Sequence, residues 1–191
     1  MRGLEIRELG LADLPTLSEI NPTFISDAIL RVECEEQGVN LIWRLTEVPL
    51  DQPFDRGKGY SLLAHDLEDM RGWLKEGNGL HLLVLDASRP VALLNVQLQA
   101  WNSTGFIWNV LVDQEYRRRG LGRTLIERAI AWARQRKLRA LCLETQSNNL
   151  PAIRFYRRMG FFLSGVRADF YTNHDLERGE VALFFSYPLE A

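Results

Sequence analysis

The segment from Phe106 to Leu125 contains the clearest evidence for the fold. Its sequence is Phe106-Ile107-Trp108-Asn109-Val110-Leu111-Val112, then Asp113-Gln114-Glu115-Tyr116, then Arg117-Arg118-Arg119-Gly120-Leu121-Gly122-Arg123-Thr124-Leu125. The first part is apolar and rich in β-branched and aromatic residues, which is typical of a buried strand. The last part begins a helix, because apolar residues recur at helical spacing over the following turns. These residues are Leu121, Leu125, Ile126, Ala129, Ile130 and Ala133. A short basic loop with two glycines therefore joins a strand to an amphipathic helix.

This basic loop has the chemistry of an anion site. Gly120 and Gly122 let the backbone approach a bulky group, since glycine has no Cβ. The first amides of the helix lack intrahelical partners, and the helix dipole favours negative charge there. The loop is predicted to hold a pyrophosphate, with a solvated helix start as the alternative. It is not a P-loop, because Gly122-Arg123-Thr124 lacks the lysine that would reach the phosphates, nor does it have the three spaced glycines of a dinucleotide fingerprint.

A second strand and helix follow the first pair. Leu141-Cys142-Leu143-Glu144-Thr145-Gln146 has the composition of a strand. Asn149 comes just before a short helix with Pro151 in its first turn, and Gly160 ends that helix. The two pairs indicate an α/β protein whose strands form one sheet.

Together the two segments resemble the GNAT N-acetyltransferase superfamily. The resemblance rests on Arg117-x-x-Gly120-x-Gly122 after one strand and on Asn149-x-x-Ala152-x-x-x-Tyr156-x-x-x-Gly160-Phe161 after the next. It implies a single-domain α/β fold with a mixed, mostly antiparallel central sheet flanked by helices. Two strands of that sheet, ending near Val112 and Gln146, are expected to splay apart and admit acetyl-CoA. The resemblance covers the second half of the chain, so residues 101–191 are expected to form the acetyl-CoA-binding core and residues 1–100 the substrate side.

One branch of the superfamily, the streptothricin acetyltransferases, looks most similar. The matching residues are Trp101-Asn102, Leu143-Glu144-Thr145-Gln146-x-Asn148-Asn149 and Tyr171. That branch usually carries Ile-Glu-Asp-Ile on the central strand, where this chain has Ile107-Trp108-Asn109-Val110, and Arg167 stands where the branch tends to carry aspartate. Because carboxylates that would hold a cation are missing, we expect a less cationic amine or a peptide amino group as acceptor. The residues expected at the acceptor are Trp108, Arg167 and Tyr171.

The resemblance also implies how acetyl-CoA is held. The loop from Arg118 to Arg123 would bind the pyrophosphate, and the backbone of the preceding strand would pair with the pantetheine arm. Asn149 either bonds the pantetheine amides or only caps its helix. The residues expected to contact acetyl-CoA are Val110, Leu111, Val112, Arg117, Arg118, Arg119, Gly120, Leu121, Gly122, Arg123, Asn149 and Tyr156.

Acetyl transfer to an amine needs a base for the ammonium and an acid for the departing thiolate. Tyr156 is the candidate acid, with a core tyrosine as the alternative. Glu144 is the candidate base, with a structural hydrogen-bond acceptor as the alternative. Asn109 would relay a water in place of the missing carboxylates. Because the acidic pair is lost, a catalytically degenerate acyl-CoA-binding sensor or interaction module is the alternative to an enzyme.

Composition limits the other possibilities. The chain has 191 residues, 46% hydrophobic, which suits a single domain spanning residues 1–191. Residues 1–100 hold 16 acidic and 9 basic side chains and residues 101–191 hold 9 and 14, which favours an anionic cofactor on the second half rather than nucleic acid. No leader or membrane span is evident, so a cytoplasmic protein is expected, with a homodimer as an open alternative to a monomer. The two cysteines and three histidines are too scattered to predict a metal site or a disulfide.

The remaining elements are predicted from periodicity and turn residues. A hairpin is expected from residues 28–34 and 39–46, with a turn at Glu36-Gln37-Gly38. Pro49, Asp51, Pro53, Gly57 and Gly59 predict a flexible loop over the substrate. Strands are also expected at residues 4–9, 80–86, 91–101, 162–171 and 181–187, and helices from residue 13 and at 66–75.

Overall fold

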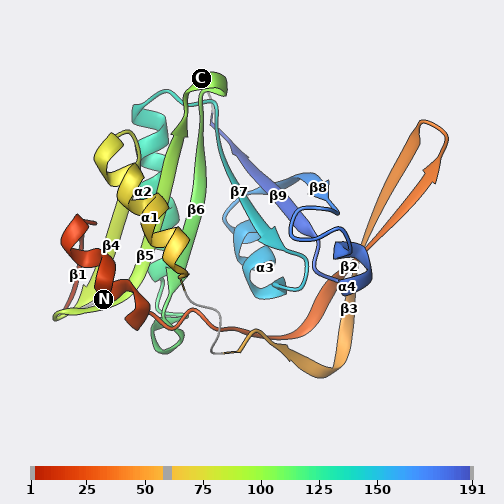
Figure 1. Cartoon of the computed structure of the whole chain (residues 1–191), viewed down its shortest axis with the longest axis horizontal. Helices are drawn as coiled ribbons and strands as arrows, with labels where there is room; N and C mark the ends of the chain where they lie inside the picture. The colour runs from red at the N-terminus through yellow and green to blue at the C-terminus, as the bar shows by residue number, and fades with distance from the viewer. Residues whose placement is uncertain (1–2, 58–61, 190–191) are drawn as a thin grey trace. The chain divides into compact units, whose positions relative to one another are not determined.

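The computed structural model describes residues 3–57 and 62–189, and the chain divides into two compact units. One unit consists of Met1–Thr23, Gly57–Cys142 and Pro188–Ala191. The other consists of Phe24–Arg56 and Leu143–Tyr187. Figure 1 shows the elements of both. The predicted functions of residues 1–100 and 101–191 remain predictions, as does the single domain.

The first unit contains an antiparallel sheet. Its strands lie in the order β1 (Leu4–Glu8), β4 (Leu80–Asp86), β5 (Arg89–Gln99) and β6 (Thr104–Val112). Five consecutive residues of β4, His81 to Leu85, are buried, as are eight of β5. Such continuous apolar runs are expected of strands that are covered on both faces.

Helices cover the two faces of this sheet (Figure 1). On one face, the 3₁₀ helix η1 (Leu11–Glu19) and α1 (Ala64–Glu76) pack around the fully buried Met70 and against Leu83 and Leu93. On the other face lies α2 (Leu121–Gln135), whose buried residues are the six that the sequence predicts as its apolar face. Gly105 of β6 allows a close approach there, because a Cβ at this position would lie 2.8 Å from Leu141 and 3.2 Å from Trp132. Two shorter 3₁₀ helices, η2 (Ala100–Asn102) and η3 (Gln114–Tyr116), flank β6.

The second unit contains the strands β7, β9 and β8, in that order, and a separate hairpin. Strand β7 (Ala140–Gln146) begins in the first unit and continues into the second, where α3 (Leu150–Arg158) follows it. Strand β8 (Phe162–Arg167) pairs antiparallel with β9 (Ala182–Pro188), and the short α4 (Asp175–Arg178) lies between them in sequence. The hairpin consists of β2 (Ile25–Gln37) and β3 (Asn40–Asp55).

The predicted α/β fold class, with a mostly antiparallel sheet flanked by helices, is confirmed, and so is the hairpin. The predicted loop at Pro49–Gly59 is wrong up to Asp55, because β3 continues through Pro49 and Pro53. Proline is tolerated there since β3 has a neighbour on one edge only. Opposite Asp27 the register skips from Ser26↔Phe54 to Ala28↔Pro49, which accommodates the extra residues as a bulge. Gly59 lies outside the described residues.

The strand predicted at residues 162–171 is too long, since β8 ends at Arg167 and a turn with α4 follows. Cys34 and Cys142 are both only partly buried.

Candidate functional site

Strand β6 carries a bulge where the branch resemblance breaks down. Asn95 of β5 pairs with Asn109 and Val96 pairs with Ile107, so Trp108 has no partner on β5. A bulge bends the strand and re-aims the side chain of its extra residue. Trp108 is 51% exposed and stacks on Trp73 with ring centroids 5.5 Å apart. Its indole is therefore half packed and half available to a ligand, and the neighbouring Asn109 is partly buried.

The segment after β6 is fixed by Asp113, which sequence reasoning overlooked. This carboxylate is buried and accepts hydrogen bonds from the backbone amides of Asn21 and Glu115 at 3.0 Å. Arg89 forms an ion pair with it at 3.1 Å. The signal in the sequence was an aspartate placed directly before a turn, where its side chain can cap the following amides.

The three arginines that follow have different environments. Arg117 is partly buried, and its guanidinium donates to the carbonyls of Val112, at 3.1 Å, and Pro22, at 2.7 Å. It holds the start of the loop against the end of β6. Arg118 is exposed with φ of 59°, and Arg119 is exposed and lies 4.8 Å from the centre of the Tyr116 ring. Two of the three cations are thus available to an anion in solvent.

Gly120 begins α2 in the left-handed region, with φ of 86°, and no side chain caps the helix. The first intrahelical bond runs from the Thr124 amide to the Gly120 carbonyl at 3.0 Å. A Cβ at Gly120 would meet no described atom within 4 Å, so open space lies beside the helix start. The amides of Leu121 to Arg123 precede that first bond, and the dipole of a 15-residue helix favours an anion beside them. These features fit a pyrophosphate, while the Arg123 side chain pairs with Glu127 at 2.8 Å.

In the second unit, the structure brings two predicted site residues into contact. The hydroxyl of Tyr171 donates a hydrogen bond to Oε1 of Glu144 on β7. Burial raises the pKa of Glu144 to about 7, against the effect of the Tyr171 hydrogen bond, and the negative charge of Glu180 adds to the rise. Glu180 itself is paired with Arg56 at 2.9 Å. A carboxyl that titrates near neutral pH is suited to exchange protons with a substrate.

Asp175 holds Tyr171 in place and is a second positioning residue that the sequence did not reveal. It is buried, and it accepts hydrogen bonds from the amides of Phe170, Tyr171 and Thr172. Burial alone would raise its pKa, but these bonds hold the pKa of Asp175 below its ordinary value. The segment 170–172 is therefore ordered around a fixed negative charge.

Helix α3 carries the other two candidates. The Asn149 side chain accepts from the Ala152 amide at 3.3 Å, which confirms the capping role and leaves its amide group as a donor. Tyr156 is 8% exposed and packs against Phe155 and Phe161. Its surroundings are those of a core residue, and its predicted role as an acid remains a prediction.

Arg167 has a partner of its own. Its guanidinium pairs with Asp169 at 2.9 Å and lies 5.4 Å from the centre of the Phe170 ring. Since its charge is already compensated, Arg167 opposes a cationic acceptor less strongly than an unpaired arginine would.

Within residues 3–57 and 62–189, no three His, Cys, Asp or Glu side chains lie close enough together to hold a metal ion. Nor does any helix in the described part of the chain have the length and apolar character to cross a membrane.

Comparisons with known proteins agree with these features. A model of the acetyltransferase (GNAT) family matches residues 42–161. The chain is 30% identical over 191 residues to streptothricin acetyltransferase of Streptomyces lavendulae, covering 96% of this chain and 94% of that protein. The crystal structure of nourseothricin acetyltransferase superposes with a TM-score of 0.80 and 27% identity, covering 98% of this chain and 99% of that one.

A further solved structure is a putative streptothricin acetyltransferase from Bacillus anthracis in complex with acetyl coenzyme A. Its TM-score is 0.74 at 26% identity, with 97% of this chain and 99% of that chain covered. The predicted resemblance is confirmed, in the superfamily and in its streptothricin branch. The chain belongs to the GNAT acetyltransferase family.

Proposed function

We propose that this protein transfers an acetyl group from acetyl-CoA directly to a primary amine of a small molecule or to an exposed peptide amino group. Acetyl-CoA supplies an activated thioester, so the protein has to position the donor and manage two protons. The proposal is supported by the open helix start at Gly120 and by the carboxyl of Glu144.

Arg118, Arg119 and the first amides of α2 would hold the pyrophosphate. Arg117 supports them indirectly, because it ties the loop to the Val112 and Pro22 carbonyls. The backbone of Val110 to Val112 would pair with the pantetheine amides, and an N–H near the Trp108 bulge would polarise the thioester carbonyl. The free amide group of Asn149 would donate to the same arm.

Glu144 would accept a proton from the ammonium of the acceptor, directly or through a water. The observation that carries this role is its pKa of about 7, because an ordinary glutamate is too weak a base to do so efficiently. Tyr171 would hold the carboxylate in one orientation through its hydrogen bond. Tyr156 would then give its hydroxyl proton to the departing sulfur, and Asn109 would orient a water beside β6.

The acceptor is proposed to be less cationic than a streptothricin. Trp108 and Asn109 replace the acidic pair, and each close charge pair that is lost from a partly buried site would remove about 1–3 kcal/mol. Trp108 presents the outer part of an indole that is anchored on Trp73, which suits a flat or apolar group. Arg167 stands where the branch tends to carry aspartate, so this position does not replace the lost negative charge either.

Thiol release from acetyl-CoA, measured with a panel of amines and short peptides, tests this proposal. We expect turnover with at least one member, an acetylated product by mass spectrometry, and a lower kcat/KM for streptothricin than for the best hit. Turnover of streptothricin near the diffusional limit would contradict the proposed acceptor class. Tight binding of acetyl-CoA without turnover of any amine would instead favour the acyl-CoA sensor that the Trp108-Asn109 substitution suggests.

A further inference from the structure

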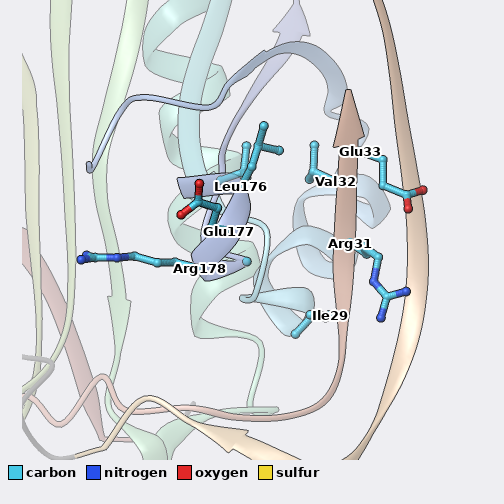
Figure 2. A pocket seen from close by; sticks show the side chains of 9 residues that line it. Ile29, Arg31, Val32, Glu33, Leu176, Glu177 and Arg178 are labelled. Carbon is cyan, nitrogen blue, oxygen red and sulfur yellow. The ribbon is translucent and has the colours of Figure 1, made fainter. Parts of the chain in front are cut away.

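The second unit has a pocket of about 320 Å³ between β2 and α4 (Figure 2). Ile29, Val32 and Leu176 contribute to its apolar lining. The charged residues that line it are two acids and two arginines, namely Glu33, Glu177, Arg31 and Arg178. Because these charges balance, the pocket does not select a class of ligand by charge. The buried polar groups that call for an explanation lie mostly in the first unit.

Three of them form a cluster on the face of the sheet that α1 covers. His81 of β4 and Asn95 and Gln97 of β5 are 8%, 0% and 5% exposed. In the described part of the chain, Nε2 of His81, Nδ2 of Asn95 and Oε1 of Gln97 have no hydrogen-bond partner. Buried polar atoms without partners are unfavourable, so apolar side chains would make a more stable core here. The cluster therefore indicates a role other than stability.

The side chains of His81 and Asn95 orient each other. Nδ1 of His81 donates a hydrogen bond to Oδ1 of Asn95 at 2.9 Å, because an amide oxygen can only accept. The neutral ring then keeps a lone pair on Nε2. His81 is also the ladder partner of Asn95, and Asn95 is the ladder partner of Asn109 on β6. The three residues thus form one row across three strands, and the row ends at the bulge that carries Trp108.

A series of ring contacts joins His81 to the same bulge by a second route. The Trp73 ring of α1 lies 6.2 Å from the His81 ring, centre to centre, with 9° between their planes. It also stacks on Trp108, at 5.5 Å and 27°. Phe106 contacts Trp108 at 4.8 Å. These separations are those at which aromatic rings attract each other. Since Trp108 has no partner on β5, the contacts with Trp73 and Phe106 hold its half-exposed indole.

The surroundings of His81 offer little compensation for a positive charge. Burial lowers the pKa of His81 below 6.5, against the effect of its hydrogen bond with Asn95. Strand β5 has no charged side chain from Val91 to Gln99. On β1, Arg7 shares the same face and is paired with Asp13 at 2.7 Å. The charged residues of α1 within one turn of Trp73 are not buried, and they are Asp69, Arg71, Lys75 and Glu76.

We propose that His81 and Asn95 are positioning residues for the acceptor, and that through Trp73 and the β6 bulge they fix the Trp108 indole as the surface on which the acceptor lies. This inference rests on the proposed function, which makes Trp108 an acceptor contact. A proton on His81 places an uncompensated charge beside Trp73 and changes the stacking, so Trp108 moves with it. Binding of acetyl-CoA at the start of α2 does not depend on this device.

The direct test is fluorine NMR of the protein labelled with 5-fluorotryptophan, without any substrate. The signals of Trp73 and Trp108 are assigned by substitution with phenylalanine. We expect both signals to shift as the pH falls, with one common midpoint below 6.5. Both shifts should disappear in His81→Phe, which keeps a ring beside Trp73 but cannot take up a proton. Trp101 and Trp132 take no part in the stacking and serve as internal controls. A Trp108 signal that does not follow the titration of His81 overturns the proposal.

The second test separates acceptor binding from acetyl transfer. In alkaline buffer, Asn95→Leu should raise KM for the best amine at least fivefold and leave both kcat and the KM for acetyl-CoA within about twofold. His81→Gln can still donate to Asn95 but lacks the ring, so it should give a smaller rise. The matched control is Leu82→Val, because Leu82 is buried on the opposite face of β4.

An equal rise in the control, or a lower kcat with an unchanged KM for the amine, contradicts the positioning role. If no amine is turned over, the proposed function fails, and the NMR titration alone decides whether His81 holds Trp108. Circular dichroism checks that each variant is folded.

Discussion

Replacing Glu144 with glutamine removes the ionisable group and keeps its shape. The glutamine Oε1 can still accept the hydrogen bond from Tyr171, so the local structure is retained. In the parent protein the carboxylate is the group that gains or loses a proton near neutral pH. The variant therefore separates the proton-transfer role of Glu144 from its structural role.

The expected effect on stability follows from the pKa. A rise from 4.5 to about 7 corresponds to up to about 3 kcal/mol of unfavourable free energy when Glu144 is ionised in the folded protein. Because the folded pKa is the higher one, the parent is most stable below the unfolded value. It loses stability as the pH rises from 4.5 to about 7 and changes little above that. The glutamine variant should thus be more stable than the parent in alkaline buffer and nearly equal to it in acid.

The effect on catalysis should have the opposite sign. In the parent, kcat/KM for the best amine should rise as the pH passes through about 7, as Glu144 becomes a base. In Glu144→Gln that limb should disappear and the rate should fall roughly a hundredfold, the usual contribution of a general base. The assay is thiol release across pH, with denaturant unfolding curves measured in the same buffers.

Two results would refute this reasoning. A glutamine variant that keeps the same pH limb would assign the limb to the ionisation of the amine itself. A variant that loses stability at alkaline pH would show that the buried carboxylate is stabilised by its surroundings, contrary to the direction of its pKa.

Tyr156→Phe should lower kcat roughly a hundredfold with acetyl-CoA affinity unchanged, where chemistry limits turnover; a change within about twofold would return Tyr156 to the core. Substituting Gly120 and Gly122 together with larger residues should weaken CoA binding, measured by calorimetry, at least tenfold. A side chain at Gly120, where φ is 86°, would occupy the open space that is proposed to hold the pyrophosphate. Parent-like affinity would place the pyrophosphate elsewhere. Burial lowers the pKa of His81, despite its hydrogen bond with Asn95, so the protein should lose stability as the pH falls below 6.5. His81→Gln should flatten this dependence of stability on pH. An unchanged slope in the unfolding curves would assign the pH dependence to other groups.

Most helices and strands of the fold could be predicted from the periodicity of apolar residues. The residues of the candidate site could be predicted only in part. The apolar spacing from Leu121 to Ala133 predicted α2 and its buried face correctly. The prolines of β3 led to the wrong prediction of a loop, because proline occurs both in turns and in edge strands. The sequence alone does not show which strand pairs with β3. Local signals cannot show which strand lies beside which.

The same limit applies to the chemistry. Glu144 was a candidate because of its motif, but its pKa is raised mainly by burial in the fold. The hydrogen bond from Tyr171 opposes that rise and the charge of Glu180 adds to it, and both residues are distant in sequence. In the sequence Arg117 is one of three adjacent arginines with nothing to distinguish it. Only the structure shows that its guanidinium donates hydrogen bonds to the Val112 and Pro22 carbonyls. Contacts between distant residues decide both cases.

The proposed role of Glu144 as the base requires that its side-chain carboxyl has a pKa close to 7. A carbon-detected NMR titration of that carboxyl measures this pKa directly. We expect a pKa of about 7 for this carboxyl in the parent protein. Tyr171→Phe should raise that value further, since it removes a bond to the carboxylate, and Glu180→Gln should lower it, since it removes a like charge. A parent value near 4.5, unaffected by either substitution, would contradict the proposed role of Glu144 as the base.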